Sequence, residues 1–405
     1  MKKFNKVLSV VVASAMVMAM AGCGNTYNGS AATGTNAATE SAAADNGAAS
    51  GSVFKIGGIG PTTGGAAVYG LAVQHGAEIA VEEINAAGGI NGYQVEFKFQ
   101  DDEADAEKSV NAYNALKDWG AQIIDGSTTS GACIAVTDKT KEDNMFQITP
   151  SGSAVECVQY DNNFRVCFSN PNQGLASAQY IGENGLAEKI AVIYDSSDVY
   201  SSGIYEKFVK EAENQPFEVV AAEAFTADNK TDFSVQLQKA KDAGADMVFL
   251  PIYYQESALI LTQAAAMGYA PKWFSCDGMD GILGGVDNFD VSLTEGVMLL
   301  TPFAADATDD LTQSFVTKYK EKYGETPNQF AADSYDAIYV IKAAIEKSGV
   351  TPDMSVSDIC DGMKAAMTEI TVDGLTGNGM TWTADGEANK APKAVVIENG
   401  AYKAM

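Results

Sequence analysis

The chain has 405 residues, which suggests two domains rather than one, and its 46% hydrophobic and 20% charged residues are typical of a folded globular protein. Its 53 acidic and 26 basic residues give a formal net charge of −27, and no run of Lys or Arg forms the basic stripe that nucleic-acid binding needs. The single histidine, His75, excludes metal sites that need two histidines, and we expect neither a metal nor a cofactor.

The N-terminus has the pattern of a secretory signal. Three lysines among the first six residues precede an apolar run over residues 7–21, which is too short to span a membrane comfortably. The segment Met20-Ala21-Gly22-Cys23 resembles the bacterial lipobox, in which the cysteine becomes the lipid-modified first residue. We therefore expect a signal peptide over residues 1–22 and lipidation at Cys23. The alternative is a plain signal followed by an incidental cysteine.

Residues 24–52 consist almost wholly of Ala, Gly, Ser, Thr and Asn. Such a segment buries too little apolar surface to fold, so it is predicted to be disordered. About 30 residues of flexible chain reach roughly 30 Å, at about 5–6 Å per square root of the residue number. Residues 23–52 would therefore tether a membrane-held lipid to a folded domain.

Five further cysteines follow Cys23, an odd number, so at least one of them is unpaired. No Cys-x-x-Cys occurs, which argues against a thiolate metal site or a redox motif, and buried structural cysteine is the favoured interpretation. Whether Cys157 and Cys167 form a disulfide is left open by their spacing.

From residue 53 the chain alternates short apolar runs with amphipathic stretches. In the first half the runs predict strands over residues 54–59, 95–99, 123–124 and 146–149. Helical spacing between them predicts helices over residues 70–87, 104–119 and 132–141.

After residue 150 this pattern breaks off, and it resumes at residue 190. The predicted elements are strands over 190–194, 219–225, 247–252 and 273–276 and helices over 204–212, 233–243 and 258–267. Strands that alternate with helices form right-handed βαβ units and parallel sheets. Because the pattern occurs twice with about the same number of elements, we expect an α/β fold with two doubly wound parallel-sheet lobes.

Ligands of doubly wound sheets bind outside the carboxyl ends of the strands. The glycine-rich segment 57–65 follows the first strand, but it lacks the G-x-G-x-x-G spacing of a dinucleotide loop, because Thr63 stands where the last glycine should be. Hydroxyl-rich turns over 126–131 and 149–154 follow the third and fourth strands. Helix capping would explain either turn alone, whereas two at consecutive strand ends favour a cradle for a carboxylate.

Tyrosines and one acid follow the strands of the second half. Tyr200 and the pair Tyr253-Tyr254 could contact aliphatic groups while their hydroxyls form hydrogen bonds. Asp277, followed by glycine, offers a carboxylate for an ammonium group, and its other interpretation is an ordinary turn residue. A closed cleft must replace the water around both ends of a zwitterion, which needs both kinds of group.

These residues, in this order, resemble the type I periplasmic-binding-protein superfamily, and within it the leucine/isoleucine/valine-binding protein family of ABC importers. The similarity extends over about residues 53–400. Its most specific part is Gly60-Pro61-Thr62-Thr63-Gly64, followed by Gly76-Ala77-Glu78 and by the run from Ala80 to Gly92.

The resemblance implies that a free amino acid binds in a cleft between two lobes. By position, Thr129 and Ser130 match the pair that holds the ligand carboxylate. Ser151 and Ser153 match the next strand-end contacts, which bind carboxylate and ammonium. The family has serine where this chain has Thr129, which keeps the hydroxyl.

The resemblance assigns the other end of the ligand to the second half of the chain. Asp277 matches an acidic ammonium partner, although it is one methylene shorter than the family's glutamate. Tyr200 and Tyr253 match family tyrosines, with Tyr254 as the alternative to Tyr253, and Tyr69 falls where the family often has an aromatic wall.

The resemblance also assigns the lobes. Lobe I would comprise residues 53–169 with 302–375, and lobe II residues 170–301 with 376–405. Three chain crossings between them would form a hinge that permits closure on the ligand.

The implied function is that of a substrate-binding lipoprotein of an ABC importer, a monomer anchored by lipid on the extracytoplasmic face of the cell membrane. It would capture a small amino acid, with the branched-chain type favoured, and deliver it to the membrane permease. Two alternatives use the same fold: another small solute such as an amide, urea or an aromatic acid, and a ligand sensor for a receptor. An enzyme is not expected, because His75 is the only imidazole and the chain has no G-x-S-x-G elbow.

Overall fold

The computed structural model describes residues 51–405. The predicted signal peptide, Cys23 and almost all of the predicted tether lie outside these residues. Among the helices that the model describes, none is long and apolar enough to cross a membrane.

The first sheet is parallel throughout and has the strand order β2-β1-β3-β4-β5. Its strands are β1 (Phe54–Gly60), β2 (Val95–Asp101), β3 (Ile123–Asp125), β4 (Phe146–Thr149) and β5 (Asn163–Arg165). The central strands β3 and β4 are buried along their whole length, as expected where helices cover both faces of a parallel sheet.

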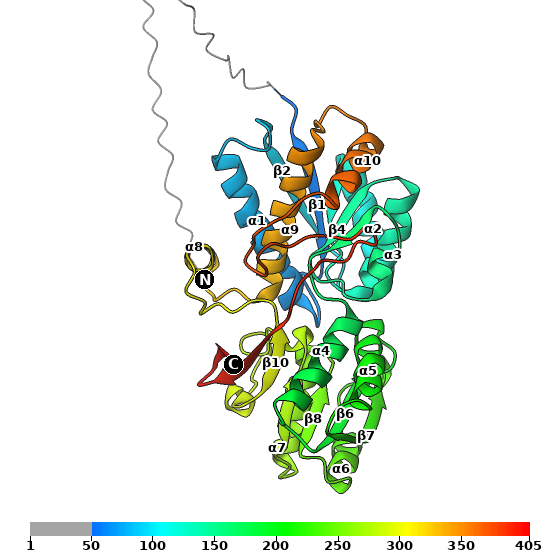
Figure 1. The fold of residues 1–405 in the computed structure, drawn as a ribbon, viewed down its shortest axis with the longest axis vertical. Coiled ribbons are helices and arrows are strands. Elements are labelled where there is room, and N and C mark those ends of the chain that lie inside the picture. Colours follow the sequence, from blue (N-terminus) through cyan, green and yellow to red (C-terminus); the bar gives the residue numbers. More distant parts are fainter. Residues whose placement is uncertain (1–50) are drawn as a thin grey trace, which may run out of the picture. The chain divides into compact units, whose positions relative to one another are not determined.

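Six helices belong to this first lobe (Figure 1). They are α1 (Ala67–Ala86), α2 (Ala106–Trp119), α3 (Ser130–Glu142), α8 (Asp310–Tyr323), α9 (Gln329–Ser348) and α10 (Val356–Met367). Helices α1 and α9 pack in close contact, because Gly76 leaves room for the backbone of α9. A Cβ atom at Gly76 would lie 2.0 Å from the carbonyl oxygen of Ala331.

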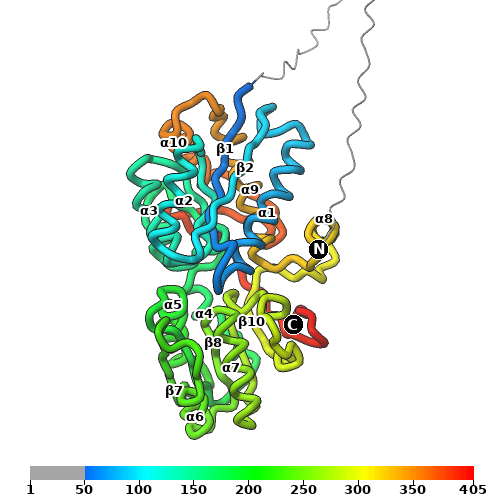
Figure 2. Tube along the Cα trace, turned by 180° about the vertical axis from the view of Figure 1, so that it is seen from behind, coloured from blue at the N-terminus to red at the C-terminus, as the bar shows by residue number. Residues whose placement is uncertain are grey.

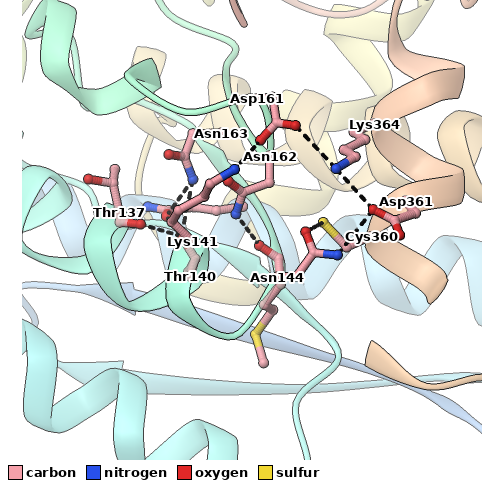
Figure 3. Close-up of polar contacts among 12 residues, drawn as sticks. Thr137, Thr140, Lys141, Asn144, Asp161, Asn162, Asn163, Cys360, Asp361 and Lys364 are labelled. Carbon is pink, nitrogen blue, oxygen red and sulfur yellow. Dashed lines mark hydrogen bonds and ion pairs between the residues drawn. The ribbon is translucent and has the colours of Figure 1, made fainter. Parts of the chain in front are cut away.

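Helix α10 is fastened to the rest of the first lobe by a polar cluster (Figure 3). The carboxylate of Asp161 pairs with Lys141 of α3 at 2.6 Å and with Lys364 of α10 at 3.2 Å. The side-chain amide of Asn144, just after α3, donates to Asp361 of α10 at 3.0 Å. These exposed pairs add little stability each, and they set where α10 lies against α3.

The second sheet has the order β12-β11-β10-β9-β8-β6-β7. Its strands are β6 (Lys189–Asp195), β7 (Glu218–Phe225), β8 (Met247–Leu250), β9 (Lys272–Ser275), β10 (Met298–Thr301), β11 (Lys393–Glu398) and β12 (Ala401–Ala404). The strands β6 to β10 are parallel and repeat the strand order of the first sheet. The C-terminal hairpin of β11 and β12 adds two antiparallel strands beside β10 (Figure 2).

Four helices belong to the second lobe: α4 (Asn170–Glu183), α5 (Val199–Ala212), α6 (Ser234–Asp242) and α7 (Tyr254–Ala266). The expected fold class, two doubly wound α/β lobes, is therefore confirmed. The elements predicted from periodicity agree with the model to within a few residues at most ends, although α7 begins four residues earlier and α5 five residues earlier than predicted. The sequence pattern did not predict β5, α4 or any of the elements after residue 276.

The chain passes between the lobes after β5, after β10 and before β11. Residues 376–392 differ from the expected lobe assignment, which placed them in lobe II. The indole of Trp382 donates to the carbonyl of Arg165 at 2.8 Å, and the carbonyl of Gly386 accepts from the amide of Arg165 at 3.0 Å. This segment therefore lies on the first sheet, and the chain leaves the first lobe near residue 390 rather than 375.

Candidate functional site

The hydroxyl-rich turns lie at the carboxyl ends of β3 and β4. Helix α3 begins at Ser130, and Thr129 precedes it in an extended conformation without capping the helix through its side chain. The Oγ1 atom of Thr129 is buried and has no hydrogen-bond partner among the described residues. A hydroxyl and the first free N–H groups of α3 thus face the same space, which suits a carboxylate.

Hydrogen bonds join the turn after β4 to the turn after β3. The Oγ atom of Ser130 accepts hydrogen bonds from the amides of Ser153 and Ala154, both at 3.1 Å. The hydroxyl of Ser151 donates to the carbonyl of Thr128. Ser130 and Ser151 therefore fix the two turns to each other, and both residues line the same cavity.

Asp277 approaches the same space from the second lobe. It follows β9, and its side chain is held by two donors, the Tyr200 hydroxyl at 2.6 Å to Oδ1 and the Gln173 amide at 2.8 Å to Oδ2. Burial raises the pKa of Asp277 to about 7, against the lowering effect of these two hydrogen bonds, and the nearby charge of Asp333 raises it further. A buried carboxyl of this kind favours a cation as its partner.

Aromatic rings form the walls between these polar ends. The rings of Tyr200 and Tyr253 stack with 5.0 Å between centroids, and Tyr69 meets Phe330 at 4.5 Å. The Tyr69 hydroxyl donates to the carbonyl of Gly278 and accepts from the amide of Tyr254 at 3.1 Å. Tyr69 belongs to the first lobe and both of its hydrogen-bond partners to the second, so this contact joins the lobes beside the cavity.

A small cavity of about 20 Å³ lies between these groups. Seven of the eight predicted ligand-binding residues line it together with three that the sequence did not single out; the lining is Tyr69, Thr128, Thr129, Ser130, Ser151, Tyr200, Tyr253, Asp277, Gly278 and Phe330. The eighth, Ser153, does not line the cavity; its amide supports Ser130 and its carbonyl accepts from the amide of Asn170 at 2.7 Å.

The structure distinguishes Tyr253 from Tyr254, the two residues between which the sequence did not decide. Tyr253 lines the cavity, whereas Tyr254 begins α7 and packs edge-on against Tyr69, with 5.1 Å between ring centroids. Gly278 is required beside them, since a Cβ atom there would lie 2.6 Å from the Tyr200 hydroxyl oxygen.

The other residues that the sequence raised lie away from this cavity. His75 stacks on Tyr323 of α8 at 3.6 Å between centroids, and burial lowers its pKa. Cys157 and Cys167 are both buried and unpaired. Within residues 51–405, no group of three or more His, Cys, Asp or Glu side chains is placed to hold a metal ion.

Comparison with known proteins adds a second line of observation. A family model of periplasmic binding proteins matches residues 53–401. The Leu/Ile/Val-binding protein homolog 3 of Brucella melitensis is 31% identical over 300 residues, which are 74% of this chain and 80% of the relative. A leucine-, isoleucine-, valine-, threonine- and alanine-binding protein of Pseudomonas aeruginosa is 30% identical over 73% of this chain and 79% of its own length.

Solved structures show the same likeness. The branched-chain amino acid transporter substrate-binding protein LivJ of Streptococcus pneumoniae, in complex with isoleucine, superposes with a TM-score of 0.78 at 28% identity and covers 87% of this chain and 98% of its own. The leucine-binding protein LivK of Thermotoga maritima gives 0.77 at 27% identity, with the same coverage of both chains.

Proposed function

Because the chain belongs to the leucine/isoleucine/valine-binding family of type I periplasmic binding proteins, we propose that its cleft captures a free α-amino acid. Relatives and solved structures described as branched-chain amino acid binding proteins support an ABC-transporter substrate-binding protein, and the proposal concerns this chain's own cargo. One observation carries it. The Thr129 hydroxyl, which has no hydrogen-bond partner within residues 51–405, and the buried Asp277 carboxyl lie on the wall of one cavity, from opposite lobes.

The two ends have complementary roles in the proposed complex. Thr129 and the N–H groups at the start of α3 bind the carboxylate, where the helix dipole also favours negative charge. Asp277 binds the ammonium group, held in place by Tyr200 and Gln173. The rings of Tyr69 and Phe330 contact the side chain of the cargo, and a branched-chain side chain suits such an apolar wall.

The remaining parts of the proposal concern transport. We infer that Cys23 carries the lipid that holds the protein at the membrane, and that the loaded protein delivers its cargo to ABC permease subunits. The lobes close on the cargo by rotation at the three crossings, as in other hinged binding proteins.

A thermal-shift and calorimetric screen of the purified protein against the twenty amino acids tests the cargo. A binder at 100 times its dissociation constant adds about 2.7 kcal/mol of stability. We expect leucine, isoleucine or valine to raise the melting temperature most. Amides, urea and benzoate serve as comparison solutes, and a shift with one of these but with no α-amino acid would overturn the proposal.

A further inference from the structure

The ammonium group of Lys390 is buried where the chain crosses between the lobes. The side chain is 1% exposed, and Nζ donates to Asp333 Oδ1 at 2.7 Å and to the carbonyl of Val166 at 3.1 Å. It also lies 5.7 Å from the ring centroid of Phe168. Val166 and Phe168 belong to the first crossing and Lys390 to the third, so one side chain fastens both crossings to α9.

The same helix forms part of the cleft. Phe330, in the first turn of α9, lines the cavity, and Gln329 donates its side-chain amide to the carbonyl of Asp277 at 2.9 Å. Asp333 lies one turn further along the same face of α9 and is itself buried. Its charge raises the pKa of Asp277. Lys390, Asp333 and Asp277 are thus three charge-bearing groups in a row in space, from the hinge to the cavity.

This row of charges determines the net charge that a cationic group in the cavity would experience. Lys390 and Asp333 cancel as an ion pair, which leaves the charge of Asp277 for the cargo. If Asp333 lost its charge, the ammonium of Lys390 would lose the carboxylate to which it is hydrogen-bonded, and among the described residues Asp336 would remain as its nearby negative group. A buried charge that loses its hydrogen-bonded partner is costly, and that of Lys390 has the same sign as the ammonium group of an amino acid.

We propose that Lys390 is a positioning residue for the cargo site, which balances the charge of Asp333 behind the cleft while it fastens the first and third crossings to α9. The inference rests on the proposed function, since it takes the cargo to carry an ammonium group.

Other groups face these carboxyls as well. Around Asp277 they are Tyr200, Tyr253, Gln173, Cys276, Cys167 and Gln329, and around Asp333 they are Lys390, Asp336, Thr376 and Cys167. Burial raises the pKa of the tyrosines and thiols among them, so these stay neutral between pH 5 and 8. Asp336 is held by the amides of Leu375 and Thr376 and by the Thr376 hydroxyl.

Three variants test the charge balance by calorimetric titration with leucine at pH 7.5. Asp333→Asn is expected to weaken binding about tenfold or more, because Lys390 loses its hydrogen-bonded carboxylate while its positive charge stays behind the cleft. Asp333→Asn combined with Lys390→Met removes both charges and is expected to recover affinity to within about threefold of the parent. Lys393→Met, an exposed lysine three residues further on, is the control and should leave affinity unchanged.

The recovery separates charge balance from mere structural support. If the pair only braced the crossings, the double variant would bind no better than Asp333→Asn, and that result would overturn the inference. Retention of full affinity by Asp333→Asn would overturn it as well.

A second measurement needs no cargo. The carboxyl carbon of Asp277 in the empty protein can be titrated by NMR. Asp333→Asn should lower the midpoint by about one pH unit or more, because a negative neighbour is lost and a positive one remains. In the double variant the midpoint of Asp277 should lie close to that of the parent again. An unaltered midpoint refutes the inference whether or not leucine binds, whereas the expected shifts in a protein that binds no amino acid would refute the proposed cargo alone.

Discussion

Substitution of Asp277 by Asn is the sharpest test of the proposed site. The change removes one charge and keeps the size of a side chain that is 5% exposed. The Tyr200 hydroxyl, which donates to Asp277 in the parent, can turn to accept from the new amide. The walls of the cavity are therefore expected to stay in place, and the proposed ammonium group loses Asp277, the one charged residue among the described residues that line the cavity.

The magnitude follows from burial. Truncation of one partner of a buried, hydrogen-bonded charge pair costs about 2–5 kcal/mol, which corresponds to a loss of affinity of roughly 30-fold to several thousandfold. The stability of the empty protein should move differently. The folded state holds a proton on Asp277 up to about pH 7, whereas the unfolded chain releases it near its ordinary pKa of 3.8. The stability contributed by this group is complete below about pH 4 and is lost as the pH rises through 7.

Titration calorimetry with leucine and thermal unfolding at pH 8 measure both effects. Asp277→Asn should lose binding and unfold at the same temperature as the empty parent or above it, because it no longer buries a charge. Asp228→Asn, at an exposed position of the second lobe, is the matched control. Unchanged leucine affinity in Asp277→Asn would refute the assigned role of this carboxyl, since unfolding could not explain it.

Three further predictions concern pH, the carboxylate cradle and the anchor. Binding of an ammonium group requires ionised Asp277, so the affinity should fall about tenfold for each pH unit below 7 and stay level just above it. Calorimetry in two buffers of different ionisation enthalpy would detect the proton that binding releases. An affinity that does not change from pH 5.5 to 8 would contradict the role of Asp277. Thr129→Val removes a buried hydroxyl that has no partner among the described residues, so the empty protein should be no less stable while leucine binding weakens roughly tenfold or more; a lowered melting temperature with intact affinity would show a structural role instead. Cys23→Ala should move the protein from the membrane fraction to the soluble fraction of whole cells, and continued membrane association would argue against the lipid anchor.

Much of the fold could be predicted because its signals are local. Short apolar runs marked the buried strands, and helical spacing marked α1, α2 and α3. The meeting of Thr129 and Asp277 at one cavity follows from topology, since residues at the carboxyl ends of strands gather at one edge of each sheet.

The parts that escaped prediction depend on contacts between distant segments. Phe330 and Gln173 lie on helices whose place beside the cavity only the packed lobes define. Ser153 shares its hydroxyl chemistry with Ser151, and only the direction of the turn decides which of them lines the cavity. Residues 376–392 have no strong periodicity, and individual contacts such as that of Trp382 hold them on the first sheet.

The Tyr69 hydroxyl has a consequence for the motion of the lobes. It hydrogen-bonds to Gly278 and Tyr254 across the lobes, so the protein's own side chain supplies contacts that favour the closed arrangement. Opening of the cleft must break both hydrogen bonds. Tyr69 therefore helps to set the balance between open and shut lobes, and a ligand shifts that balance only by the difference between its affinities for the two forms.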